Sequence, residues 1–225
     1  MEQTAKSYRL LPAITGLFVA TLIIAETTAS KLLSVGPMTL SAAIIIFPLS
    51  YLFNDILTEV YGYRVSRKVI WTGFASLILM IFCYEGVLAL PGADFWKDQA
   101  AFQTVLGNLP RIVTASMTAY FVGEFCNSFA LAKFKVKMEG KLISLRFVAS
   151  TVVGEFVDSI IFFPMAFYGV LPNATLVSII LSSWGLKILW EIAALPATLP
   201  FVRYLKRIEH EDHYDRHTDF NPFKF

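Results

Sequence analysis

Apolar residues occur in continuous runs along most of the chain, and short polar or proline-containing segments separate these runs. A helix needs about 20 apolar residues to cross a hydrocarbon layer that is about 30 Å thick. The pattern therefore predicts six membrane-spanning helices, at residues 10–29, 38–57, 69–90, 112–132, 147–168 and 174–203. Because apolar and polar residues do not alternate within the runs, the pattern does not fit a membrane β-barrel. We expect an all-α fold, with residues 1–225 forming one transmembrane domain that ends in a polar, solvated, cytoplasmic tail at 208–225.

Composition and charge agree with a membrane protein. Hydrophobic residues make up 56% of the chain and charged residues 16%, whereas soluble domains carry about 25% charged residues. With the N-terminus inside the cell, only three of the 19 Lys and Arg residues (Lys31, Lys97 and Arg111) fall in outside segments. Lys187 lies within the last span, which leaves 15 on the inside. Because positive residues favour the cytoplasmic side, both termini are predicted to be cytoplasmic.

One short polar phrase occurs twice, in the predicted fourth and fifth spans. Residues 123–128 read Gly-Glu-Phe-Cys-Asn-Ser, and residues 154–159 read Gly-Glu-Phe-Val-Asp-Ser. In a helix, positions i, i+3 and i+4 share one face, so each phrase predicts one polar face. These faces are formed by Glu124, Asn127 and Ser128 in the first phrase and by Glu155, Asp158 and Ser159 in the second.

The predicted topology places the two phrases at similar depth, near the middle of the membrane, on helices that run in opposite directions. Equivalent motifs on oppositely directed spans are typical of the inverted repeats of secondary transporters, which bind substrate between the repeats. The competing interpretation is that the Gly and Ser residues only pack the helices together. Because a charged residue at the centre of a span costs about 2.5–3.5 kcal/mol, we favour a polar substrate site between the two phrases.

Further polar residues within spans extend the candidate site. Asn54 and Asp55 lie near the end of the second span, and Lys187 and Glu191 lie within the sixth. Two alternatives stay open for these residues. Asp55 and its neighbour Glu59 form either a substrate gate or a structural salt-bridge cluster with the arginines that follow them. Lys187 either binds substrate or pairs with Glu191, which lies one helical turn away.

A site with several carboxylates and an amide suits a flat ligand that is neutral or cationic and rich in N–H donors, because a carboxylate accepts paired donors. Aromatic side chains of the spans are candidates for stacking on such a ligand, namely Tyr120, Phe125, Phe156, Phe162, Phe163 and Trp190. Glu26, near the outer end of the first span, belongs either to an outer vestibule or to the membrane interface. The spans contain no His/Glu metal signature and no Ser–His pair, so no metal site, cofactor or enzymatic activity is predicted.

Several segments together resemble a known family. They are Phe-Asn-Asp-Ile-Leu-Thr-Glu-Val-Tyr-Gly at residues 53–62, the stretches 111–128 and 150–162, Tyr-Asp at 214–215 and Phe-Asn-Pro-Phe at 220–223. On these motifs the chain resembles the queuosine precursor transporter family, whose members are vitamin-uptake-transporter-type proteins with six spans in the bacterial inner membrane. The resemblance covers nearly the whole chain, and the set of motifs is more specific than any one of them.

The resemblance implies uptake of two precursors of the modified tRNA base queuosine, 7-cyano-7-deazaguanine and 7-aminomethyl-7-deazaguanine. Their guanine-like edge offers N1–H and an exocyclic amine, a donor pair that one carboxylate accepts. We place Glu124 or Asp158 at this edge, Asn127 at the carbonyl, and a second carboxylate such as Glu155 at the aminomethyl cation. Some family members carry Gln and Asp in place of Glu124 and Asn127, so the choice between these residues stays open.

Two classes of function remain in competition. The first is an importer that works by alternating access around the site, either by facilitated diffusion or coupled to protons. The alternative is a membrane-embedded substrate-binding subunit that needs a separate energising partner. The expected partners are the lipid bilayer, a small-molecule substrate and a second copy of the chain in a homodimer. No nucleic acid is expected, because the basic residues follow the positive-inside pattern.

Overall fold

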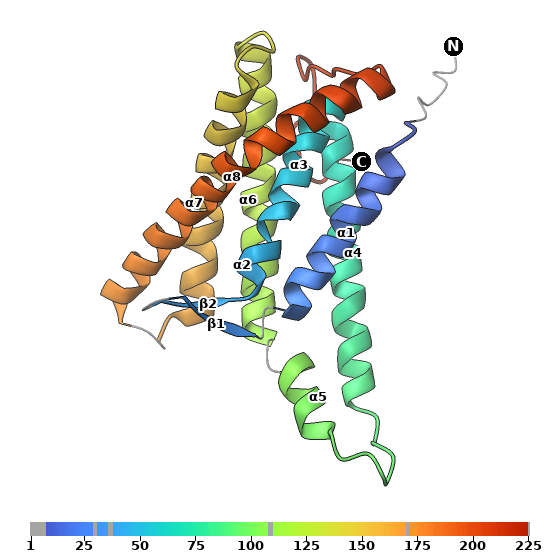
Figure 1. The fold of residues 1–225 in the computed structure, drawn as a ribbon, viewed down its shortest axis with the longest axis vertical. Helices are drawn as coiled ribbons and strands as arrows, with labels where there is room; N and C mark the ends of the chain where they lie inside the picture. The colour runs from blue at the N-terminus through green and yellow to red at the C-terminus, as the bar shows by residue number, and fades with distance from the viewer. Residues whose placement is uncertain (1–7, 29–30, 36–37, 108–109, 170–171, 225) are drawn as a thin grey trace.

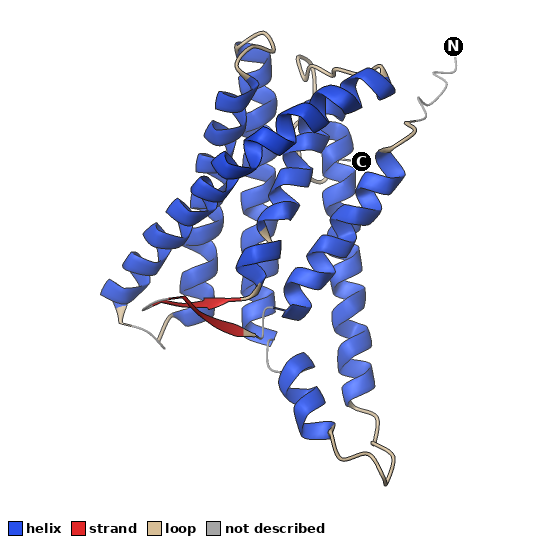
Figure 2. Ribbon diagram, in the orientation of Figure 1, coloured by secondary structure: helices blue, strands red, loops and turns tan. Residues whose placement is uncertain are grey.

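The structure of the protein is a computed structural model that describes residues 8–28, 31–35, 38–107, 110–169 and 172–224. Its helices are α1 (Leu11–Thr28), α2 (Ala43–Ile46), α3 (Pro48–Tyr61), α4 (Tyr63–Leu88), α5 (Gln99–Leu106), α6 (Pro110–Lys137), α7 (Ile143–Phe167) and α8 (Asn173–Glu209), and its strands are β1 (Leu32–Val35) and β2 (Met38–Ser41). The long helices form one bundle, with the start of α1, the α6–α7 turn and the end of α8 at one end (Figure 1). The hairpin and α5 lie at the opposite end (Figure 2).

Within the residues that the structure describes, five helical segments are long and apolar enough to cross a membrane. They are Leu11–Thr28, Ala43–Tyr61, Tyr63–Leu88, Ile143–Phe167 and Leu176–Glu209, which match the first, second, third, fifth and sixth predicted spans. α6 occupies the predicted fourth span and has 28 residues, but it is the least apolar of the long helices. The chain is therefore a multi-pass membrane protein. The exact number of six spans and the side on which the termini lie remain predictions.

The predicted second span is interrupted at its start. Residues 38–41 form β2, which pairs antiparallel with β1 in the register Leu32↔Ser41 and Val35↔Met38. The helix begins only at Ala43. The described chain is otherwise helical, as predicted, and this short hairpin is the exception. A second break separates α2 from α3, because Pro48 has no N–H to continue the helical hydrogen bonds. Phe47 nevertheless keeps helical backbone angles, and the two short helices follow each other in line.

The two repeated phrases lie where α6 and α7 cross, and their glycines make that crossing close. A Cβ added at Gly123 would lie 2.9 Å from the Cβ of Asp158 and 3.0 Å from the carbonyl oxygen of Gly154. A Cβ added at Gly154 would lie 2.5 Å from the Cβ of Asn127 and 3.0 Å from the carbonyl oxygen of Gly123. Each glycine thus faces the polar residue of the other phrase, as an approximate two-fold axis requires. Small residues at helix crossings allow such backbone contact in membranes.

The C-terminal tail packs against the bundle, so the expectation of a solvated tail was wrong for its central part. The Asp215 carboxylate is buried and accepts a hydrogen bond of 3.0 Å from the backbone N–H of Tyr63, at the start of α4. The Tyr63 hydroxyl donates to the carbonyl oxygen of Phe220 at 2.9 Å, and the indole N–H of Trp71 donates to that of Pro222 at 2.8 Å. The tail therefore covers the first turns of α4.

Candidate functional site

The polar residues predicted from α3 and α6 meet in the interior of the bundle. The Asn54 amide donates to the Ser128 hydroxyl at 2.7 Å, and the Asn127 amide donates to Oδ1 of Asp55 at 2.5 Å. The Ser66 hydroxyl of α4 donates in turn to the carbonyl oxygen of the Asn54 side chain. All of these side chains are buried. The first repeated phrase is therefore fixed to α3 by side-chain hydrogen bonds.

Lys187 joins α8 to the second repeated phrase on α7. Its ammonium nitrogen lies 2.6 Å from Oε2 of Glu155 and also contacts the carboxylate of Asp158. The two carboxylates share one helix face, so a single lysine reaches both. The alternative pairing of Lys187 with Glu191 is wrong, because the ion pairs of Lys187 go to α7. Lys187 keeps 17% of its side chain exposed, whereas the side chains of Glu155 and Asp158 are 2% and 6% exposed.

Several buried carboxylate oxygens of the site accept no hydrogen bond from any residue that the structure describes. They are both oxygens of Glu124, Oδ2 of Asp55 and Oε1 of Glu191. The Asn54 amide donates one hydrogen to Ser128 and lies close enough to Glu124 to interact with its carboxylate as well. A buried polar group without a partner costs about 1–3 kcal/mol or more. These oxygens therefore form an acceptor-rich surface that is suited to a donor-rich ligand.

Negative groups outnumber positive ones at the site. Asp55 lies within electrostatic range of Glu191 and Glu155, and Glu124 lies within range of Asp55, Glu155 and Asp158. Lys187 is the cation that pairs with carboxylates of this group in the described chain. All of the ten residues expected at the site lie on α3, α6, α7 and α8, and the helices that carry them pack on one another. The structure thus brings nine of them into one cluster, with Ser159 buried on the same helix as Glu155 and Asp158, and their role in binding remains a proposal.

Sequence reasoning left Glu26 outside the site, and the structure places it at the edge of the cluster. The Glu26 side chain is buried on α1 and accepts a hydrogen bond of 2.7 Å from the Ser116 hydroxyl of α6. It also lies within electrostatic range of Asp158. The signal was a carboxylate inside a span, but because Glu26 lies close to the span end, the sequence left an outer vestibule and an interfacial position both open. The contact with α6 instead turns it inward.

The aromatic wall of the site differs from the predicted one. Phe47, Tyr51 and Tyr120 pack on one another with ring centroids 5.5 Å apart, and the Lys187 ammonium lies 5.4 Å from the centroid of Tyr51. Among the predicted aromatic residues, Tyr120 belongs to this wall. Phe125 instead packs on Tyr63 and Trp71 toward α4, and Phe156 is 41% exposed and packs on Trp184.

One turn from Asp55, Glu59 forms a second buried charge cluster. Arg146 of α7 donates to both carboxylate oxygens of Glu59, and Lys206 of α8 lies 2.6 Å from Oε1. Lys135 of α6 lies 3.7 Å from the same oxygen and 2.6 Å from Oδ1 of Asp212 in the tail. Burial alone would raise the pKa of the Asp212 carboxyl, but hydrogen bonds from Lys135 and Lys206 outweigh it and lower the pKa. The cluster ties four helices and the tail together at one end of the site.

The arginines expected to neutralise Asp55 and Glu59 have other roles. Arg67 is buried and donates to the carbonyl oxygens of Asp219 and Asn221 in the tail. Arg64 is exposed and makes no ion pair with the described residues. Glu59 thus belongs to a salt-bridge cluster, and Asp55 belongs to the polar site. The salt-bridge alternative therefore holds for Glu59, and a role of Asp55 in a substrate gate remains a prediction.

Sequence comparison places the chain in a family of membrane transporters. A family model described as "Putative vitamin uptake transporter" matches residues 41–201, a range that contains all ten of the expected site residues. The chain belongs to this vitamin uptake transporter family.

Within that family, the chain is similar to a protein from Bacillus subtilis (strain 168) that carries the name "Probable queuosine precursor transporter". The two are 27% identical over 175 residues, which cover 77% of this chain and 76% of the relative. No solved structure matches the chain at a significant level.

Proposed function

We propose that this protein imports queuosine precursors, 7-cyano-7-deazaguanine, 7-aminomethyl-7-deazaguanine or both, across the bacterial inner membrane into the cytoplasm. The observation that carries the proposal is the fully buried carboxylate of Glu124, neither oxygen of which accepts a hydrogen bond from a described residue. The name of the Bacillus subtilis relative and the family match support the substrate class. The bacterial inner membrane, the cytoplasmic termini and the homodimer remain predictions that rest on sequence.

The polar cluster offers a partner for each edge of such a ligand. A carboxylate accepts the N1–H and the exocyclic amine together, and Glu124 has both oxygens available for them. The Asn127 amide donates one hydrogen to Asp55 and keeps its second hydrogen for a ligand carbonyl. An aminomethyl cation would compete with Lys187 for Glu155 and Asp158. The aromatic wall of Phe47, Tyr51 and Tyr120 supports stacking of the flat ring system.

Import by alternating access requires one end of the site to open while the other closes. The Glu59 cluster closes the end that the charge pattern assigns to the cytoplasm, because Glu59 and Arg146 are fully buried. Release of substrate into the cytoplasm would require Arg146 and Lys206 to separate from Glu59. Facilitated diffusion and proton coupling are both compatible with this scheme.

The test is uptake in a bacterium that neither synthesises the precursors nor has its own importer. Each deazaguanine is supplied at low nanomolar concentration, and queuosine in tRNA is measured. We expect wild type to restore queuosine and E124Q to reduce initial uptake by about 10- to 100-fold, because one or two charge-assisted hydrogen bonds are lost. E85Q is the matched control, since Glu85 is exposed near the end of α4. Failure of an inserted wild-type protein, or equal uptake by E124Q and E85Q, would refute the proposal.

The second candidate is a substrate-binding subunit that needs a separate energising partner. The family description and the polar cluster fit both candidates, because both must hold the ligand within the membrane. Liposomes that contain only the purified chain separate them. Uptake of labelled precursor by these liposomes supports the importer, whereas binding without uptake supports the subunit.

A further inference from the structure

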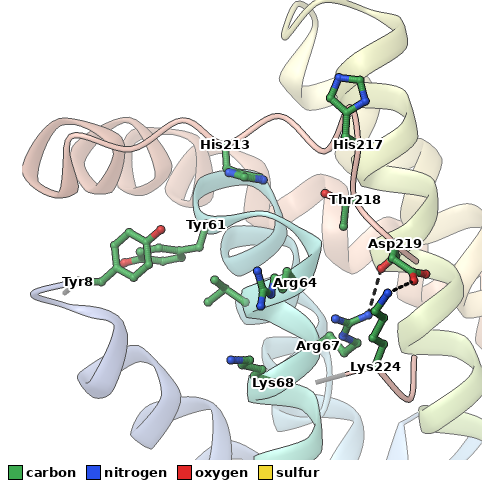
Figure 3. Close-up of a pocket in the computed structure, with 11 residues that line it drawn as sticks. Tyr8, Tyr61, Arg64, Arg67, Lys68, His213, His217, Thr218, Asp219 and Lys224 are labelled. Atoms are coloured by element: carbon green, nitrogen blue, oxygen red, sulfur yellow. Dashed lines mark hydrogen bonds and ion pairs between the residues drawn. The ribbon is translucent and has the colours of Figure 1, made fainter. Parts of the chain in front are cut away.

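A cavity of about 570 Å³ opens beside the start of α4, between that helix and the C-terminal tail (Figure 3). Its walls come from the first two turns of α4, the end of α3, Tyr8 before α1, and tail residues 213–224. It is separate from the polar cluster, since none of the expected site residues lines it. The proposed transport function makes no use of this cavity.

Basic side chains dominate the cavity wall. Arg64, Arg67, Lys68 and Lys224 line it, and Asp219 is the carboxylate among its lining residues. Lys224 pairs with Asp219 at 2.9 Å, so the other three cations face the cavity without a carboxylate partner among the described residues. The formal charge of the lining is +3 with neutral histidines. A cavity with this charge attracts an anion.

Arg67 and the N-terminus of α4 form a rigid, positively polarised part of the cavity wall. The Arg67 side chain is 2% exposed and is held by the tail carbonyls of Asp219 and Asn221, while its Nε has no described partner. The cavity surrounds the N-terminal turns of a 26-residue helix, where the helix dipole and free N–H groups favour negative charge. The Asp215 carboxylate accepts from the N–H of Tyr63 and from the Thr218 hydroxyl, which leaves the N–H groups of Arg64 and Val65 in the first turn to add to the positive potential.

The depth of these side chains in the membrane points to the source of the anion. The apolar part of the third span begins at about residue 69, directly after Lys68. Arg64 lies four residues earlier, about 6 Å further along the helix axis at 1.5 Å per residue. The headgroup layer on each side of the hydrocarbon is about 5–8 Å thick. The cationic side chains therefore lie at the level of lipid phosphates.

We propose that this cavity binds the phosphate of an anionic phospholipid headgroup from the cytoplasmic leaflet, held between α4 and the C-terminal tail. Arg64 and Lys68 are the exposed cations that reach the phosphate, and Arg67 holds the tail that forms the opposite wall. A free phosphate ion offers the same chemistry without the acyl chains. Basic cavities on the cytoplasmic side of membrane helices suit such headgroups.

The test is native mass spectrometry of the full chain released from detergent, titrated with phosphatidylglycerol and, separately, with phosphatidylcholine. We expect one phosphatidylglycerol to bind at least tenfold more tightly than phosphatidylcholine. The R64Q/K68Q variant should lose about 25-fold in phosphatidylglycerol affinity, since each basic residue near a lipid surface contributes about fivefold. The matched control is K137Q/R207Q, which removes one Lys and one Arg that are exposed at the same end of the bundle and outside the cavity.

The outcomes separate the possible sources of the anion. Wild-type affinity in K137Q/R207Q together with the loss in R64Q/K68Q supports the proposal. Equal losses in the two variants, or no loss in R64Q/K68Q, would refute it, because binding would then follow general surface charge. Displacement of phosphatidylglycerol by 10 mM inorganic phosphate would also overturn the lipid assignment and show that the cavity holds free phosphate. An unfolding temperature of R64Q/K68Q equal to that of wild type shows that the variant is folded.

Discussion

Replacement of Gly154 by alanine tests whether the close contact between α6 and α7 sets the geometry of the polar site. The added Cβ would lie 2.5 Å from the Cβ and 3.1 Å from the Cα of Asn127, whereas ordinary van der Waals contact begins at 3.4 Å. Both Asn127 atoms are fixed to the backbone of α6, so no rotamer change relieves the clash. The helices must separate by about 0.9 Å to lengthen the 2.5 Å approach to the Asn127 Cβ to the 3.4 Å of ordinary contact.

Overpacking of this kind costs about 1–3 kcal/mol. For a chain of this length, each kcal/mol lowers the unfolding temperature by about 2–4 °C, so G154A should unfold about 2–12 °C below wild type. The same separation pulls Asn127 away from Asp55, to which it now donates at 2.5 Å. Precursor uptake should therefore fall even in the G154A molecules that remain folded.

The control series uses other glycines of the same bundle. G123A should be milder than G154A, because its Cβ would approach Asp158 Cβ to 2.9 Å, a shortfall of about 0.5 Å. G185A should be neutral or stabilising, because nothing lies within 4 Å of its Cβ and alanine favours a helix over glycine by about 1 kcal/mol. Thermal unfolding of the purified proteins gives the order. Equal unfolding temperatures for G154A and G185A would show that the contact does not constrain the helices.

Three further predictions concern the charge cluster and the tail. R146M should destabilise the protein by about 3 kcal/mol, because breaking a buried ion pair costs at least this much. K141M, which changes an exposed lysine, should leave stability unchanged. Unfolding temperatures of the two variants test this. D215A should leave the N–H of Tyr63 without its acceptor and lower the free energy of unfolding by about 1 kcal/mol. Hydrogen exchange in the tail should then become faster. Because the folded pKa of Asp212 is lowered, its stabilisation is present above about pH 3.9 and lost as pH falls through the folded pKa. The difference in unfolding temperature between wild type and D212N should thus shrink below about pH 4, and a constant difference would contradict the assignment.

Much of the helical layout could be predicted from the sequence, because a helix that crosses the membrane needs an apolar run as long as the hydrocarbon layer is thick. The predicted first span at 10–29 and third span at 69–90 correspond to Leu11–Thr28 and Tyr63–Leu88. The last predicted span ended at 203, whereas α8 continues to Glu209, because a helix does not end where its apolar pattern ends. The repeated phrase located the α6–α7 crossing, since its polar residues had to face away from lipid.

The packing of the tail, the β1–β2 hairpin and the ion pairs of Lys187 could not be predicted from the pattern of apolar and polar residues. The tail is held mainly by backbone carbonyls that accept from Arg67, Trp71 and Tyr63, and a carbonyl has no sequence signature. β1 lies in the connection before the predicted second span, and β2 lies at the start of that span, where a short apolar segment favours a helix and a strand equally. The ion pairs of Lys187 with Glu155 and Asp158 were not predicted, because the sequence shows the i+4 neighbour Glu191 directly but does not show which helices lie side by side.

If α7 tilts on α6 during transport, the reciprocal contact of Gly123 with Gly154 is the point about which it would turn. Arg146 lies eight residues from Gly154, about 12 Å along the helix at 1.5 Å per residue. A tilt of α7 by about 10° around the fulcrum would carry Arg146 by about 2 Å and stretch its 3.1 Å contact with Glu59 beyond ion-pair range. Residues at the fulcrum would move by a small fraction of that distance. Such a tilt would move the far end of α7 while the polar faces of the two helices keep their spacing.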